Sequence, residues 1–157
     1  MSKTIARFIF VAFGATLFVV VCRCLGFVPS INVILAMLVL AAFIFILVCK
    51  VMVNFDLSKV RNEDYNKAFR QNISDVFDAM AAHMTDSCIS ALIGFWSLQD
   101  SFPAIGIEPS IVSCVCLFML IHACIAMTVN INGLTALQKD IDERIAQEQK
   151  RNLIQPQ

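Results

Sequence analysis

Residues 31–53 read INVILAMLVLAAFIFILVCKVMV, and this stretch decides the fold. Its single charged residue, Lys50, lies close to the end of the stretch. An α-helix needs about 20 predominantly apolar residues to cross the ~30 Å hydrocarbon core of a bilayer. We therefore expect a membrane-spanning helix over Ile31–Val53, with the Lys50 ammonium group reaching the membrane boundary.

The composition of the whole chain favours the same class of protein. Of the 157 residues, 59% are hydrophobic and 15% are charged, whereas soluble domains average about 45–50% apolar and about 25% charged residues. Most of the seven cysteines lie inside apolar runs. There they act as small hydrophobic side chains, and we expect no disulfide framework of the kind found in small secreted domains.

Three further segments have the length and hydropathy of a span. Ile5–Phe27 precedes the first stretch, and the short turn GFVPS joins the two into a hairpin. Val76–Leu98 and Ser110–Ile131 form the second pair, with Pro109 suited to the first turn of the last helix. We expect an all-α membrane protein with four transmembrane helices arranged as two antiparallel hairpins.

The basic residues predict the orientation of these spans. With four spans, all of the twelve Lys and Arg residues except Arg23 fall on the same side of the membrane. Because Lys and Arg accumulate in cytoplasmic loops, we expect both termini inside, in a multi-pass protein of the cytoplasmic membrane if the cell is bacterial. The loop QDSFPAIGIEP should then face outside.

This orientation divides the chain into four parts. Residues 1–53 form the first transmembrane hairpin, and residues 54–75 form a short cytoplasmic linker helix that is amphipathic and runs into the third span. Residues 76–131 form the second hairpin, and residues 132–157 form a C-terminal cytoplasmic helix and tail.

The two cytoplasmic helices carry apolar stripes. Leu134, Leu137, Ile141 and Ile145 form a narrow stripe on the C-terminal helix, which is typical of a helix that packs along another helix. The stripe packs either against the linker of its own chain or against copies of itself. A cytosolic partner protein is a further expectation, with a binding surface made of Arg61, Tyr65, Phe69, Leu137, Ile141 and Arg144.

The third predicted span differs from the others because it is polar along one face. At about 100° per residue, its histidine, one aspartate and several small residues fall within roughly a third of the helix circumference. A charge at the bilayer centre costs about 2.5–3.5 kcal/mol on insertion scales, so this face must meet a helix, another subunit or water. The predicted pore or polar interface consists of His83, Asp86, Ser87, Ser90, Gly94, Ser97 and, from the fourth span, His122.

Three arrangements would satisfy such a face. Small residues spaced four apart would let helices pack closely, with His83 and Asp86 satisfying each other. Alternatively, copies of the helix would ring a water-filled path. A proton or ion relay inside one subunit is the third arrangement.

Several function classes lack support in the sequence. It contains no phosphate-binding glycine loop, no H-E-x-x-H and no G-x-S-x-G motif, so we expect no enzyme, no cofactor and no metal. Basic residues alternate with acidic ones in the predicted cytoplasmic segments, so we expect no nucleic-acid binding.

These observations lead to a functional hypothesis. We expect a small polytopic membrane protein whose partners are the lipid bilayer and its own copies. The homo-oligomer would be an ion-conducting pore or a membrane-permeabilising effector, gated through the cytoplasmic helices. The alternative is a non-conducting membrane anchor or sensor that recruits a cytosolic protein.

Overall fold

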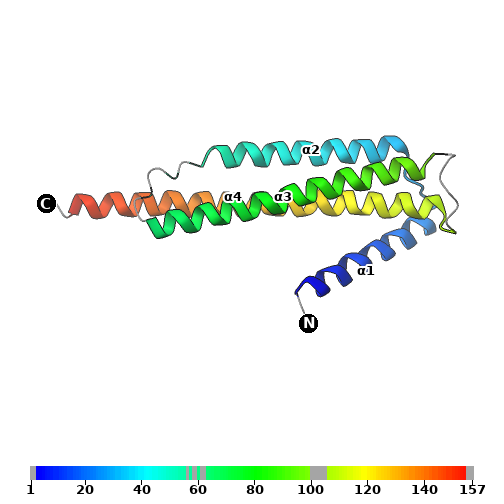
Figure 1. Cartoon of the computed structure of the whole chain (residues 1–157), viewed down its shortest axis with the longest axis horizontal. Helices are drawn as coiled ribbons and strands as arrows, with labels where there is room; N and C mark the ends of the chain where they lie inside the picture. The colour runs from blue at the N-terminus through cyan, green and yellow to red at the C-terminus, as the bar shows by residue number, and fades with distance from the viewer. Residues whose placement is uncertain (1–2, 56, 58–59, 61–62, 100–105, 155–157) are drawn as a thin grey trace.

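The described part of the computed structural model, residues 3–55, 57, 60, 63–99 and 106–154, contains four α-helices (Figure 1). The all-helical prediction is therefore confirmed. Most of the loop expected outside, residues 100–105, and the end of the tail, residues 155–157, lie outside the described residues. The helices are α1 (Lys3–Cys24), α2 (Ile31–Val53), α3 (Glu63–Ser97) and α4 (Pro109–Ile154).

Local signals in the turn explain where α1 ends and α2 begins. Gly26 has a φ of 62°, a left-handed conformation that favours glycine and commonly terminates helices. The N–H of Phe27 then donates to the carbonyl of Cys22 at 2.8 Å. Ser30 caps α2, because its hydroxyl oxygen accepts a hydrogen bond from the N–H of Val33 at 3.4 Å.

The two later helices are longer than a single span requires. The 35-residue α3 includes both the linker helix and the predicted third span, so the expected continuity is confirmed. The predicted C-terminal helix is continuous with the predicted fourth span, because α4 runs for 46 residues without a break at Gly133. The reason is packing, because Leu134 is completely buried and extends the core beyond the glycine.

The four helices are arranged around α4, which contacts each of the other three. Helices α2, α3 and α4 lie side by side, whereas α1 meets α4 near the α1–α2 turn and diverges from it towards the N-terminus (Figure 1). Gly14 marks the close approach of α1 to α4, because a Cβ atom there would lie 2.8 Å from the Phe118 ring.

The interior of the three-helix part consists of apolar side chains stacked along its length. One cluster joins Ala41 and Val48 of α2 to Met80 of α3 and Met127 of α4. A second cluster, nearer the α1–α2 turn, contains Ile34, Ala91 and Leu120.

A third cluster closes the opposite end of the bundle. Phe69 of α3 and Ile141 of α4 are buried together with Val60, and Leu137 and Ile145 pack against them. The amide of Asn66 holds the preceding segment by donating to the Leu57 carbonyl at 3.1 Å. The C-terminal apolar stripe therefore packs against the linker of its own chain, the first of the two expected arrangements.

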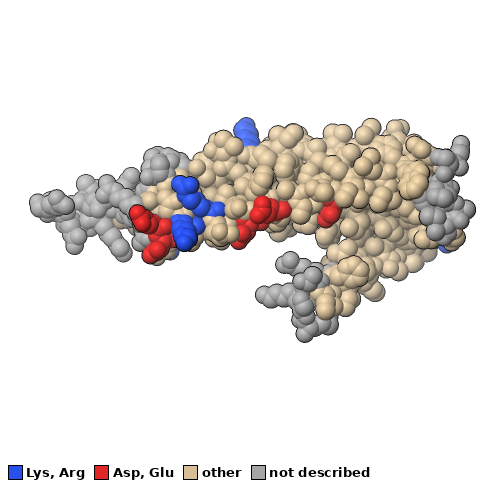
Figure 2. Space-filling model, viewed as in Figure 1, with Lys and Arg blue, Asp and Glu red and all other residues tan. Residues whose placement is uncertain are grey.

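Within the described residues, α2 and the Pro109–Gln147 part of α4 are long and apolar enough to cross a membrane. Helix α1 contributes a shorter apolar stretch, Phe8–Cys24. Large apolar side chains also remain on the surface: Phe8 and Phe10 are each 75% exposed. Most of the charged atoms visible in Figure 2 gather towards the end of the molecule at which the C-terminus lies.

Candidate functional site

The polar face predicted on the third span divides into a buried part and an open part. Ser87, Ser90, Gly94 and Ser97 are buried by the neighbouring helices. At Gly94 the approach is close, since a Cβ atom there would lie 2.9 Å from Ile34 Cδ1 and 3.2 Å from Cys116 Cβ. This part of the face is a helix-packing surface inside the chain.

The buried hydroxyl groups are satisfied by the backbone of their own helix. Ser87 Oγ donates to the carbonyl of His83 at 2.8 Å, and Ser97 Oγ donates to the carbonyl of Gly94 at 2.8 Å. Because of these local bonds, the two hydroxyl groups need no hydrogen-bond partner from another helix. The bonds explain how serines can lie in an otherwise apolar interface.

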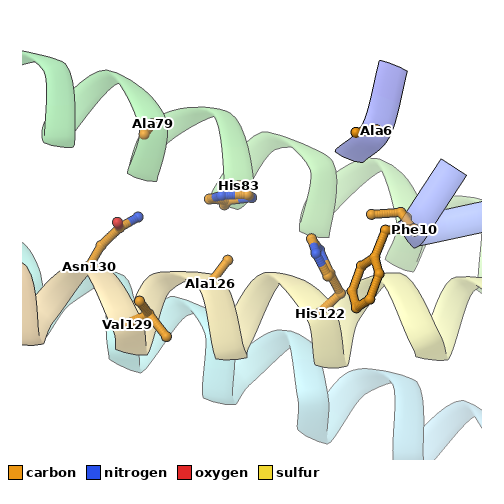
Figure 3. Close-up of a pocket in the computed structure, with 9 residues that line it drawn as sticks. Ala6, Phe10, Ala79, His83, His122, Ala126, Val129 and Asn130 are labelled. Atoms are coloured by element: carbon orange, nitrogen blue, oxygen red, sulfur yellow. The ribbon is translucent and has the colours of Figure 1, made fainter. Parts of the chain in front are cut away.

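The open part of the face is centred on two histidines. His83 of α3 and His122 of α4 point towards each other, with ring centroids 6.2 Å apart and planes at 69° (Figure 3). His122 also stacks on Phe118 of its own helix at 6.3 Å, and Phe118 contacts Phe18 of α1 at 5.8 Å. A continuous series of rings thus connects α3, α4 and α1.

A cavity of about 670 Å³ opens beside the two imidazoles, in the space between α3, α4 and the diverging α1 (Figure 3). Neither imidazole forms a hydrogen bond with another described residue, although even a neutral imidazole carries one N–H donor and one acceptor nitrogen. The cavity wall is therefore polar at this level. Its lining residues are Ala6, Phe10, Val11, Ala79, His83, His122, Ala126, Val129 and Asn130.

Asp86 lies next to this cavity but is exposed on the molecular surface. Its carboxylate interacts electrostatically with His83, yet it forms no hydrogen bond or ion pair with the part of the chain that the structure describes. Asp86 shares a helix face with Ala79 and His83, which both line the cavity. His83 in turn faces His122, at the middle of the predicted fourth span.

The chemistry of this site has to be inferred from its own residues. Comparisons with known protein families, with curated proteins and with solved structures found no match to the chain. Imidazole nitrogens can donate or accept hydrogen bonds, and a carboxylate beside them favours cations. The combination suits the passage or binding of a small cation or proton.

Sequence reasoning did not find Asn130 or the contribution of α1. Asn130 faces the cavity (Figure 3), and its amide Nδ2 donates to Met80 Sδ at 3.4 Å. The spacing of His122, Ala126 and Asn130 places them on one helix face, and this signal could have revealed the asparagine. No pattern in α1 indicates that Phe10 would line a cavity.

The residues predicted to bind a partner protein lie in different surroundings. Arg61 falls outside the described residues. Phe69 and Ile141 are only 6% and 3% exposed because this chain covers them, and Leu137 packs against the same cluster. Tyr65 and Arg144 are nearer the surface, with the guanidinium carbon 4.4 Å from the centre of the tyrosine ring.

Proposed function

We propose that the chain is a four-span membrane protein that self-associates and conducts small cations past Asp86, His83 and His122. One observation carries the proposal: the Asp86 carboxylate is exposed at the middle level of a bundle whose other exposed side chains are largely apolar. Both termini lie on the cytoplasmic side in this proposal.

The dimensions of the helices support four crossings. At 1.5 Å per residue, the 22-residue α1 and the 23-residue α2 are each about 33–35 Å long, which matches the hydrocarbon core. Helix α3 is amphipathic in its first half and apolar or small-residue-rich over Val76–Ser97, where it packs alongside α2 and α4. A helix packed between two spanning helices crosses with them.

The position of Asp86 supports self-association. A carboxylate left in contact with acyl chains would cost about 2.5–3.5 kcal/mol or more. The side chain of Ile89, three residues further along α3, is 51% exposed, so apolar area for another copy adjoins the carboxylate. A second copy, or water enclosed between copies, would cover the carboxylate.

The cavity supports conduction rather than mere packing. The serines are already buried within one chain, so they do not line the proposed path. The polar groups still available are the imidazoles of His83 and His122, the Asn130 amide and the Asp86 carboxylate, which all lie on or next to one cavity. A file of water along these groups would pass through the α1–α3–α4 space.

The proposal is tested with the purified full-length protein in planar bilayers. We expect single-channel currents that favour cations, and an Asp86→Asn variant with a smaller conductance and a reversal potential shifted towards anions. Asp78→Asn is the matched control, because Asp78 is also exposed but lies nearer the cytoplasmic end of α3. A monomer in detergent, or currents no larger than those of protein-free bilayers, would contradict the proposal.

A membrane anchor that recruits a cytosolic protein is the second candidate. It is favoured by the exposed charged end of the bundle, where Arg144 stacks on Tyr65 and where Lys67 and Arg70 are also exposed on α3. In that case Lys67→Glu and Arg144→Glu would abolish recovery of the partner from cells, whereas Asp86→Asn would leave recovery unchanged. The pore proposal expects the reverse sensitivity in current recordings.

A further inference from the structure

Two cysteines far apart in the sequence meet at the end of the molecule that carries the α1–α2 turn. Cys22 lies in the last turn of α1, and Cys114 lies near the start of α4. Their side chains are buried, with 4% and 3% of their surfaces exposed. Both cysteines line one cavity of about 350 Å³, at the end of the molecule where α1 packs against α4.

We propose that Cys22 and Cys114 are a disulfide-forming pair that fastens α1 to α4. All seven cysteines are thiols in this structure, so the bond would form by oxidation of the folded chain. The neighbouring cysteines are placed differently. Cys24 is exposed two residues further along α1, and Cys116 is buried on another face of α4. The pair is thus defined by contact between two helices and not by spacing in the sequence.

The oxidant required is a small disulfide compound or the disulfide form of a thiol oxidoreductase. The thiolate of one cysteine attacks a sulfur atom of the oxidant, which forms a mixed disulfide and releases one thiol. The second cysteine then attacks the protein sulfur of that mixed disulfide and releases the other thiol. Two S–H bonds are broken and one S–S bond is formed, and the oxidant receives two electrons and two protons.

A route to the pair runs through the cavity. The cavity is also lined by Arg23 and Glu108, which form an ion pair at the exposed rim. Because the two cysteines are buried, a small oxidant has to enter through this cavity to reach them. In cells the reaction rests on the proposed function, because the N-in and C-in topology places this end outside the reducing cytosol.

The bond would act on the packing of α1 against α4, near the α1–α2 turn. Fixing the Cys22 end of α1 would leave the opposite end, with Ala6 and Phe10, free to move relative to the histidine-lined cavity. The disulfide would thus fix one end of α1, the helix that closes one side of that cavity, while the other end could still move.

The pair is tested first with the purified full-length protein in detergent and oxidised glutathione. We expect two fewer maleimide labels per chain after oxidation, and a linked peptide containing Cys22 and Cys114 in mass spectrometry. Cys22→Ser and Cys114→Ser should each abolish the intramolecular link, and Cys24→Ser, the matched control, should retain it. Linkage through Cys24 instead, or no loss of labels, would overturn the proposal.

A second measurement separates this proposal from the proposed topology. Cells are acid-quenched, free thiols are blocked, and the thiols released by reduction are tagged with a polyethylene-glycol maleimide. In a separate sample, a Gly26→Cys variant reports the side of the membrane on which the α1–α2 turn lies. A doubly tagged chain supports the pair. If an impermeant maleimide labels Gly26→Cys but no doubly tagged chain forms, the disulfide proposal fails and the topology stands. If Gly26→Cys stays unlabelled, the topology fails, and the glutathione experiment decides the pair.

Discussion

The imidazole of His83 meets that of His122 edge to face, with 6.2 Å between the ring centroids. The contact joins α3 to α4 on helices whose other side chains form the apolar clusters with α2. Apolar packing therefore surrounds the histidine pair on the α2 side, while the cavity opens on the α1 side. This asymmetry makes separate predictions for the two sides of the α3–α4 interface.

The same enlargement of an alanine should destabilise the protein on the α2 side and have little effect on the α1 side. Ala91 is 1% exposed and packed against α2 and α4, so Ala91→Leu should lower the free energy of unfolding by about 1–3 kcal/mol through overpacking. Ala126 lines the cavity, so Ala126→Leu should change stability little. Denaturant titrations in detergent micelles compare the two variants, and equal losses would argue against an open cavity beside His122.

Removal of buried apolar volume should be costly only in the three-helix core. Leu120 is completely buried, and Leu120→Ala should lower the free energy of unfolding by about 2–5 kcal/mol. Leu92 is 69% exposed, so Leu92→Ala in detergent should stay within about 0.5 kcal/mol of the wild type. The same titration measures both variants. A large loss in the free energy of unfolding for Leu92→Ala would show that Leu92 is covered, which contradicts its exposure in this structure.

Two glycines in long helices should respond in opposite directions to alanine. Gly94→Ala brings a Cβ atom to 3.2 Å from Cys116 Cβ and 2.9 Å from the end of Ile34, and we expect a loss of about 1–3 kcal/mol. Gly133 has open space around it, so Gly133→Ala should add about 0.5–1 kcal/mol through helix propensity. Thermal unfolding of the two variants provides the comparison, and stabilisation by Gly94→Ala would show that α3 does not approach α2 and α4 this closely.

The cluster at the charged end should behave as one unit. Phe69 and Ile141 share it, so Phe69→Ala and Ile141→Ala should each cost about 2–5 kcal/mol, and their effects should not add. A double-mutant cycle measures this coupling, which is about 0.5–3 kcal/mol for residues in contact. Strict additivity would mean that the two helices do not pack here, and Phe77→Ala, at a side chain that is 40% exposed, is the control for loss of an aromatic ring.

Some of the helix bounds can be predicted from local sequence patterns. Ile31–Val53 was predicted with the bounds that α2 has, because the predominantly apolar run has the length of a span and follows the turn GFVPS. The continuity of the linker with α3 was predicted from side chains repeated at i+4. The packing of Leu134 into the core, by contrast, depends on distant residues of α2 and α3 and not on the local sequence.

The candidate site depends more on contacts between distant segments, which periodicity does not reveal. The spacing of 100° per residue placed His83, Asp86 and Ser87 on one helix face. Which part of that face is covered by α2 and α4 depends on how the three helices pack. Ser87 became completely buried and Asp86 stayed exposed. The divergence of α1, which creates the cavity beside His122, has no counterpart in its own sequence.

The central place of α4 has a consequence for how the protein is made. Helix α4 follows the other three helices in the chain. It is the helix against which α1 packs, and its side chains complete the core with α2 and α3. Until α4 has been synthesised, the earlier helices lack their main neighbour. A chain truncated within α4 would thus be a substrate for quality-control proteases. If the helices enter a membrane as proposed, insertion factors would need to bind α1, α2 and α3 until α4 is available.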